Sequence, residues 1–288
     1  MSEKKVVKAA KPKKLADPIA ASIDPATQEL IVRAQELGID TVYDRAVQMK
    51  PCNIGVQGTC CKNCSMGPCR LPLPKSGLEG EDTRKGLCGA TANTIAARNF
   101  IRMIAGGASA HSDHGRCVAE VFLSAARKES DAYKIKDIDK LLLIAPHLGV
   151  ATTVEVDGEE ADRDVDEIAL EVAEKAMNEW GKAEGELLYA KRAPQALYEK
   201  WKKAGVVPRN IDREIVEIMH RTHIGVDMDY KNLIKQGSRA AIADGWGGSM
   251  LATDLQDVLF GTPYPVQSEA NLGVMKEDHV NLVVHGHE

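Results

Sequence analysis

Six of the chain's seven cysteines lie in one short segment, between residues 52 and 88. They are Cys52, Cys60, Cys61, Cys64, Cys69 and Cys88. Glycine and proline fill much of the remaining segment, so it has no apolar face and must be ordered by something other than a core. Disulfide-stapled secreted domains disperse their cysteines and use an even number of them. The clustering therefore predicts a metal site in a protein of the reducing cytosol, a cytoplasmic location.

The spacing divides these six thiols between two sites. The neighbouring side chains of Cys60 and Cys61 diverge too much to share one small cluster, so we expect them to serve different sites. Assigned together, four thiols combine a short-spaced core with one distant ligand, which is the arrangement of a 4Fe-4S cluster. These four are Cys61, Cys64, Cys69 and Cys88. Glycines next to these cysteines would let backbone amides approach inorganic sulfide.

Cys52 and Cys60 remain as half of a second site. Two thiolates cannot complete a four-ligand cluster, but a two-fold axis between two copies of the chain would bring four together. The pair therefore predicts a homodimer with a cluster shared across its axis. Two other interpretations stay open, a structural zinc site with four cysteine ligands and a set of inert buried thiols, because soft thiolates suit zinc and iron-sulfur alike.

Composition argues against two classes of partner. The chain has 288 residues, is 44% hydrophobic and carries a formal charge of -5, enough for one large or two modest domains. No apolar run approaches the roughly twenty residues of a membrane helix, and acidic residues outnumber basic ones. We therefore expect neither membrane insertion nor nucleic-acid binding. The lysine-rich start lacks the apolar core of a secretion signal, so residues 1–24 are predicted to be a disordered basic tail or, alternatively, a polyanion-binding arm.

Helical periodicity dominates on both sides of the cysteine segment. Residues 25–49 predict two short helices, which join the cysteine loop in a cluster-binding segment over residues 25–90. Thr91 or Asn93 would cap a helix that Gly106 and Gly107 end. Further helices are expected over residues 111–128, 139–148, 164–180, 194–203, 212–220, 230–243 and 250–260, with a surface loop over 155–166. Together they predict a helical domain over residues 91–262.

The end of the chain has a different pattern. Residues 279–285 form a short β-branched run that is typical of a buried strand in an α/β sheet. A lone strand is not stable, so residues 263–288 are expected to begin an α/β (Rossmann-like) domain that is incomplete here. The predicted fold class is therefore mainly α, a helical N-terminal domain with an Fe-S cluster loop followed by the first strand or strands of a truncated α/β domain. His285 and His287 would share one face of such a strand, and geometry alone does not choose between them as ligands.

The cysteine segment carries a resemblance to a known family. Residues 58–70 read Gly-Thr-Cys-Cys-Lys-Asn-Cys-Ser-Met-Gly-Pro-Cys-Arg, which resembles the cluster-binding segment of anaerobic Ni-Fe carbon monoxide dehydrogenases. The likeness continues in order along almost the whole chain. It includes residues 86–90, 108–115, 217–222, 250–263, 271–274 and 285–287.

The resemblance implies an enzyme that oxidises CO with water to CO2 and passes electrons through 4Fe-4S clusters to an acceptor such as ferredoxin. It assigns the same four thiols to the subunit's own cluster, and Cys52 and Cys60 to the cluster shared in a homodimer. It also implies that His287 binds iron in the Ni-Fe-S active-site cluster, whose other ligands lie farther along the family's chains. The 288-residue chain is therefore expected to be inactive alone. An acetyl-CoA synthase subunit is a further implied partner, and a non-catalytic electron-transfer or zinc-stabilised dimerisation module is the alternative.

His111 and His114 are three residues apart and would share one face of a helix, with Cys117 and Glu120 continuing the line. In the family this face holds histidines that are proposed to carry protons from the active site. Imidazole suits that task because it gains and loses a proton near neutral pH. Cys117 stands where many members have a further histidine. The alternative is that His111 and His114 are surface or capping histidines.

Overall fold

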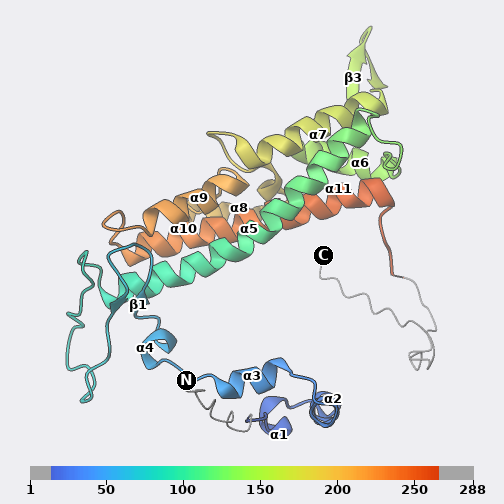
Figure 1. Cartoon of the computed structure of the whole chain (residues 1–288). Coiled ribbons are helices and arrows are strands. Elements are labelled where there is room, and N and C mark those ends of the chain that lie inside the picture. The colour runs from blue at the N-terminus through green and yellow to red at the C-terminus, as the bar shows by residue number, and fades with distance from the viewer. Residues whose placement is uncertain (1–13, 266–288) are drawn as a thin grey trace, which may run out of the picture. The chain divides into compact units, whose positions relative to one another are not determined.

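The computed structural model describes residues 14–265 of the chain (Figure 1). Two compact units divide between Gln57 and Gly58, so the predicted segment over residues 25–90 includes parts of both. Each unit is described by itself. His287, residues 279–285 and nearly all of the predicted α/β start lie outside the described residues.

The first unit contains short helices with side-chain caps. They are α1 (Pro18–Ala21), α2 (Pro25–Glu36), α3 (Val42–Gln48) and α4 (Asn53–Val56), and α2 and α3 confirm the two helices predicted over residues 25–49. Residues 18–21, expected within the tail, form a helical turn because Asp17 caps it and Pro18 stands at its start. Asp44 is buried and accepts the Ala16 amide at 2.8 Å. It also completes a capping box with Thr41.

A single long helix, α5 (Ala92–Ala126, 35 residues), runs through the second unit (Figure 1). Thr91 caps it, and the cap hydroxyl accepts the Thr94 amide at 3.2 Å. The prediction that Gly106 and Gly107 end this helix is wrong, and the separate helix expected over residues 111–128 is its second half. Each glycine costs about 1 kcal/mol relative to alanine, which packing against α7, α9, α10 and α11 along the helix offsets.

The other predicted helices are confirmed to within one residue at their ends, with the 3-10 turn after α6 included. They are α6 (Ile138–Ile144) with a 3-10 turn (Ala145–Leu148), α7 (Val165–Gly181), α8 (Gln195–Ala204), α9 (Ile211–Arg221), α10 (Tyr230–Ala243) and α11 (Met250–Phe260). A second 3-10 turn (Leu188–Arg192) precedes α8.

The loop predicted over residues 155–166 is instead largely a β-hairpin. Strand β3 (Thr153–Val156) pairs antiparallel with β4 (Glu159–Asp162). Asp157 and Gly158, the two residues between them, both have positive φ, of 53° and 86°. This is the Asp-Gly turn that matches the twist of a hairpin. Most side chains of these two strands face solvent, so their sequence is largely acidic and predicts a loop.

The segment between α10 and α11 is a wide helical turn of π type over Asp244–Ser249, so the two helices are continuous. Gly248 of this turn lies directly on α5. A Cβ on Gly115 would lie 2.5 Å from the carbonyl oxygen of Gly248, and a Cβ on Gly248 would lie 3.1 Å from the carbonyl carbon of His111. Only glycine allows two helix backbones to approach this closely. π turns of this kind are frequent at functional sites.

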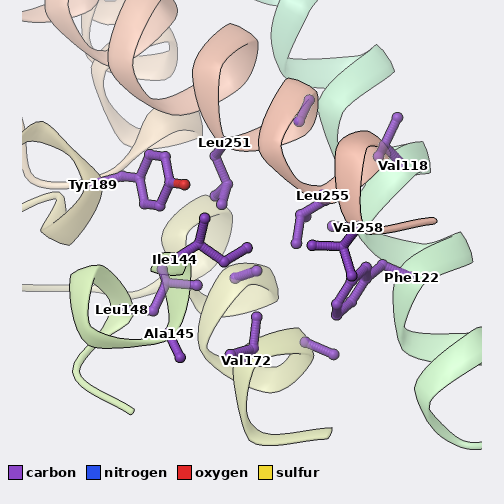
Figure 2. Packing of buried hydrophobic residues seen from close by; sticks show 14 of the residues in the cluster. Val118, Phe122, Ile144, Ala145, Leu148, Val172, Tyr189, Leu251, Leu255 and Val258 are labelled. Atoms are coloured by element: carbon purple, nitrogen blue, oxygen red, sulfur yellow. The ribbon is translucent and has the colours of Figure 1, made fainter. Parts of the chain in front are cut away.

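The main core lies around the second half of α5 (Figure 2). Phe122 of α5 is fully buried and shares this core with Val172 of α7 and Leu255 of α11. Ile144 and Leu148 close it from α6 and the turn that follows. The first half of α5 joins a smaller cluster with α9 and α10. The helix is thus supported on both halves and holds whatever lies along it in fixed positions.

Candidate metal-cluster site and histidine face

Four of the cysteines surround one pocket of the second unit, beside the first turns of α5. They are Cys61, Cys64, Cys69 and Cys88. Strand β1 (Cys60–Cys61) pairs antiparallel with β2 (Cys69–Arg70), and the register places Cys61 opposite Cys69. Successive side chains of a strand point to opposite faces. Accordingly Cys61 is buried in the pocket wall, whereas Cys60 is not part of its lining.

Apolar side chains form the inner wall of this pocket. Ala90 and Ile95 are fully buried there and pack with Cys61. Met66 and Leu87 stand at its rim and are largely exposed. A dry inner wall with an exposed rim is the environment in which hydrogen bonds to sulfur act strongly.

Several donors on the wall lack ordinary acceptors. The Leu87 amide donates to the Cys69 sulfur at 3.4 Å. Asn63 Nδ2 and Arg98 Nε are buried and have no hydrogen-bond partner within the described part of the chain. A Cβ on Gly86 would lie 3.4 Å from Cys69 Sγ, in van der Waals contact, so the backbone at Gly86 lies close beside the thiols. These donors suit a body in the pocket that accepts hydrogen bonds, as inorganic sulfide does.

The Cys88 thiol is set for deprotonation. Burial by itself raises the pKa of this thiol, but hydrogen bonds from the Ala90 backbone, the Arg98 guanidinium and the Gly225 backbone together hold the pKa below its usual range. Arg98 Nη1 lies 3.8 Å from Cys88 Sγ. The thiolate is the form that binds metal.

The thiols are spread around the pocket and not gathered on one point. Among residues 14–265, no three His, Cys, Asp or Glu side chains are placed to hold a single metal ion. A single zinc ion takes all of its sulfurs at about 2.3 Å, which requires them to converge. A cubane takes one thiolate on each iron, so its ligands surround a larger body.

Cys52 and Cys60 belong to different units. Cys52 is exposed at the start of α4 in the first unit, and Cys60 is half-buried on β1 in the second. The Cys60 carbonyl accepts a hydrogen bond from Asn99 Nδ2 at 3.0 Å, which fixes this strand on α5.

The predicted histidine face lies on the middle of α5. His111, His114 and Cys117 stand on successive turns, and His114 and Cys117 line a groove between α5 and α11. The structure shows a partner of His111 that the sequence analysis did not identify. Nδ1 of His111 lies 2.6 Å from Oδ1 of Asp244, at the start of the π turn. No local motif links these two residues, so only the helix crossing brings them together.

The sequence analysis also did not identify Arg98, although the sequence contains a signal for this residue. The residues at three-residue spacing on α5 are Ile95, Arg98 and Ile101, and all three are buried. An arginine on the apolar face of a helix is unusual and marks a buried partner. A search for a charged residue within the apolar face of this helix would have identified Arg98.

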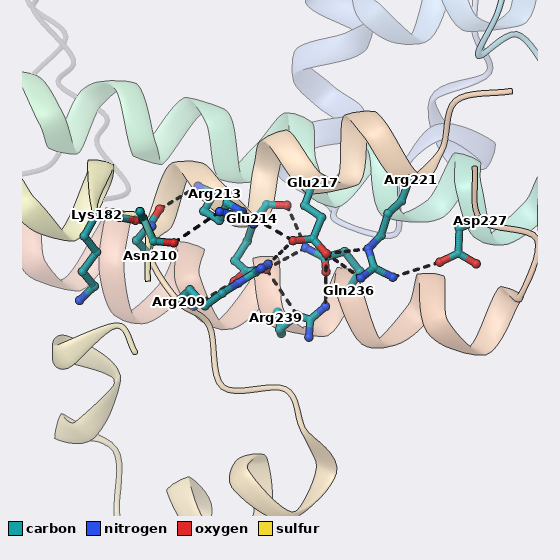
Figure 3. A network of polar contacts seen from close by, with 11 residues as sticks. Lys182, Arg209, Asn210, Arg213, Glu214, Glu217, Arg221, Asp227, Gln236 and Arg239 are labelled. Carbon is teal, nitrogen blue, oxygen red and sulfur yellow. Dashed lines mark hydrogen bonds and ion pairs between the residues drawn. The ribbon is translucent and has the colours of Figure 1, made fainter. Parts of the chain in front are cut away.

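A network of charged side chains joins α9 to α10 and to the loop that follows α9 (Figure 3). Buried Glu214 is bonded by Arg209 and by Gln236. Farther along, Arg221 pairs with the carboxylate of Asp227 at 3.1 Å. This loop supplies Thr222 and Ile224 to the wall of the thiol pocket, so the network fixes one side of the pocket.

Comparison with known proteins agrees with the resemblance in the cysteine segment. The family model described as the Prismane/CO dehydrogenase family matches residues 59–288. Carbon monoxide dehydrogenase 1 of Methanosarcina acetivorans is 49% identical over 269 residues, which are 93% of this chain and 41% of that protein. The chain thus spans about two fifths of the length of the relatives it matches.

Solved structures give the same result. A Ni-free carbon monoxide dehydrogenase from Thermococcus sp. AM4 is 47% identical with a TM-score of 0.80, and the match covers 94% of this chain and 41% of that one. An acetyl-CoA synthase/carbon monoxide dehydrogenase whose alpha subunits carry NiZn[Fe4S4] and NiNi[Fe4S4] clusters is 35% identical with a TM-score of 0.74. That match covers 90% of this chain and 37% of the other.

Proposed function

The chain belongs to the Prismane/CO dehydrogenase family, and from this membership and the four-thiol pocket we propose that it is the N-terminal part of an anaerobic carbon monoxide dehydrogenase. The whole enzyme would oxidise CO with water to CO2, releasing two protons and two electrons. In this proposal residues 263–288 begin an α/β domain and His287 is a ligand of the Ni-Fe-S cluster. His287 and all but the first three residues of that segment lie outside the described residues.

The observation that carries the proposal is the pocket itself. Four thiols, an apolar inner wall and buried donors without partners fit a 4Fe-4S cluster. When bound, such a cluster supplies one-electron transfer. The chain's own contribution is to hold four thiolates, to keep water from the inner wall through Ala90 and Ile95, and to direct the Leu87 amide at Cys69 sulfur.

Cys52 and Cys60 would hold a second cluster together with the same pair of another copy. Support comes from the strand geometry, since Cys60 is turned away from the pocket that Cys61 lines. The enzyme would accordingly be a homodimer. We place it in the cytoplasm of an anaerobe, with a ferredoxin-like electron acceptor. An acetyl-CoA synthase subunit is a further candidate partner because one matched structure contains both activities.

His111 and His114 would move protons along α5. The Asp244 carboxylate would accept a hydrogen bond from Nδ1–H of His111 over 2.6 Å, and this tautomer makes Nε2 the basic nitrogen of the ring. His114 stands one turn farther along the helix. The carboxylate thereby fixes the orientation of the first ring, and the rigid helix fixes the spacing of the two rings.

Metal analysis of the anaerobically purified chain tests the cluster assignment. We expect a brown protein with iron and sulfide, and Cys61→Ser should lose the iron of one 4Fe-4S cluster and become more sensitive to protease within residues 52–88. The matched control is Cys117→Ser, an exposed cysteine on α5, which should keep the full iron content. A colourless protein with stoichiometric zinc, or unchanged iron in Cys61→Ser, would refute the assignment.

The reaction itself is tested by CO-dependent reduction of a viologen dye. The assay uses the protein together with its downstream domains, after reconstitution with iron, sulfide and nickel. A preparation that holds its clusters but reduces no dye with CO would contradict the proposed reaction.

A further inference from the structure

Arg98 has the largest of the fully buried side chains in the described part of the chain, and only 1% of it is exposed. It lies on the first half of α5 and lines the thiol pocket. Nη1 contacts the Cys88 sulfur at 3.8 Å, and Nη2 donates to the Asp227 carbonyl oxygen at 2.7 Å and to the Met228 sulfur at 3.4 Å. Nε, a further donor, has no acceptor within the described part of the chain.

No carboxylate forms an ion pair with this guanidinium among residues 14–265. Its contact with Asp227 is to the backbone, and the carboxylate of that residue pairs with Arg221 at 3.1 Å. An arginine keeps its charge in proteins, and a buried charge without a counter-charge costs several kcal/mol. A negative charge in the pocket, on the side where Cys88 and the partnerless Nε are found, would supply this counter-charge.

The position of the guanidinium is fixed from two sides. The Thr94 hydroxyl, one turn earlier on α5, donates to the Met228 carbonyl oxygen at 2.8 Å. The same short loop therefore receives hydrogen bonds from two successive turns of the helix. The Arg98 side chain cannot turn toward solvent without breaking both its hydrogen bond to Asp227 and its contact with Cys88.

We propose that Arg98 is the counter-ion of the cluster that the four thiols hold, and that its charge raises the reduction potential of this cluster. The inference rests on the proposed function, since it requires a cluster in the pocket. Uptake of one electron makes a cluster with four thiolates more negative by one unit. A fixed positive charge at the cysteine sulfur stabilises that reduced form more than the oxidised form, because little water screens the interaction. Arg98 would thus be a positioning and tuning residue.

An EPR redox titration of the full chain, reconstituted anaerobically with iron and sulfide, tests the proposal. The signal to follow is the one that disappears in Cys64→Ser. In Arg98→Met we expect the midpoint to become more negative, so that the ratio of reduced to oxidised cluster at a fixed potential falls roughly tenfold or more, which is 59 mV for one electron. Arg98→Lys keeps the charge and should remain near wild type.

Arg102→Met is the matched control. Arg102 stands one turn farther along α5, is only half-buried and bonds the Thr222 hydroxyl at 2.8 Å, but does not contact a thiol. Its removal should leave the midpoint close to wild type because solvent screens its charge.

The outcomes separate the inference from its premise. If the wild-type chain binds no cluster in the pocket, the proposed function itself is refuted. A cluster present in Arg98→Met at the wild-type potential, or an equal shift in Arg98→Lys, would overturn the tuning role alone. If Arg98→Met assembles no cluster, assembly in Arg98→Lys supports the counter-ion role, and its failure in both variants overturns it in favour of a purely structural one.

Discussion

Glu214 lies at the centre of the charged network between α9 and α10 (Figure 3), and replacing it with glutamine tests how strongly that network holds the second unit together. Its carboxylate is fully buried. Oε1 accepts from the backbone amide and Nε of Arg209, and Oε2 accepts from Gln236 at 2.8 Å. Arg239 Nε lies 3.4 Å from Oε2. Every neighbour of this carboxylate is therefore a donor.

Glu214→Gln keeps the shape of the side chain but removes its charge. The new amide group would present a donor to Arg209 or Gln236, which are donors themselves. Arg209 and Arg239 would lose a buried counter-charge and keep their pairing with the less buried Glu217. Breaking such a pair from one side costs about 3 to 5 kcal/mol when it is fully buried. The side chains of Arg209 and Arg239 are 29% and 21% exposed, so water takes up part of the loss. We therefore expect about 3 kcal/mol, the lower end of that range.

Urea unfolding followed by far-ultraviolet circular dichroism measures this change, with the slope against denaturant compared between variants. The corresponding fall in melting temperature is about 6 to 12 °C for a unit of this size. Glu199→Gln on α8 is the control, because Glu199 is exposed and, among residues 14–265, accepts a hydrogen bond from Gln195 alone; it should change stability by less than about 0.5 kcal/mol. A loss below about 1 kcal/mol in Glu214→Gln would refute the reasoning that the network is a buried one.

Two further predictions concern the first unit and the shared cluster. Replacing Cys52 and Cys60 together with serine should remove half a cluster's iron per chain and spare the four-thiol site; loss of a whole cluster per chain would indicate an intrachain site. Hydrogen bonds from the Thr41 hydroxyl, the Ala16 amide and Gln35 hold the pKa of Asp44 far below its usual range against the effect of burial. The stability that Asp44 contributes is therefore complete above about 3.9, the pKa of an unfolded aspartate, and is lost as the pH falls below that value. Hydrogen exchange at the Ala16 amide, corrected for its intrinsic rate, should show this loss in the wild type, and equal acid sensitivity in Asp44→Asn would contradict it.

Local signals predicted most of the helices correctly. α10 and α11 begin and end at the predicted residues because apolar periodicity and their flanking residues agree there. The error at Gly106 and Gly107 has the opposite cause. Glycine is a local signal for a helix end, but its cost of about 1 kcal/mol is small beside the packing of α5 on its neighbours. Tertiary contacts of this kind cannot be read from a window of sequence.

The same distinction between local signals and tertiary contacts applies to the candidate site. The spacing of the cysteines predicted which four would lie together, and they do line one pocket, because ligands close in sequence are brought together by local turns. Asp244 and Arg98 contact residues that are distant in sequence. Asp244 bonds His111, and Arg98 bonds the Asp227 backbone in the loop after α9. Their roles depend on how α5 crosses the π turn and the Asp227 backbone, which periodicity does not specify.

The thiol pocket and the histidine face both lie along α5. Arg98 and His111 lie about 20 Å apart along this helix, at a rise of 1.5 Å per residue. Both positions are fixed from outside the helix, by the Asp227 carbonyl oxygen at one end and by the Asp244 carboxylate at the other. Between them lie Gly106 and Gly107, where a Cβ would meet no neighbouring atom, so alanine fits there without strain. Packing among residues 14–265 does not require this glycine pair, which costs stability in the part of α5 where bending would alter the spacing of Arg98 and His111.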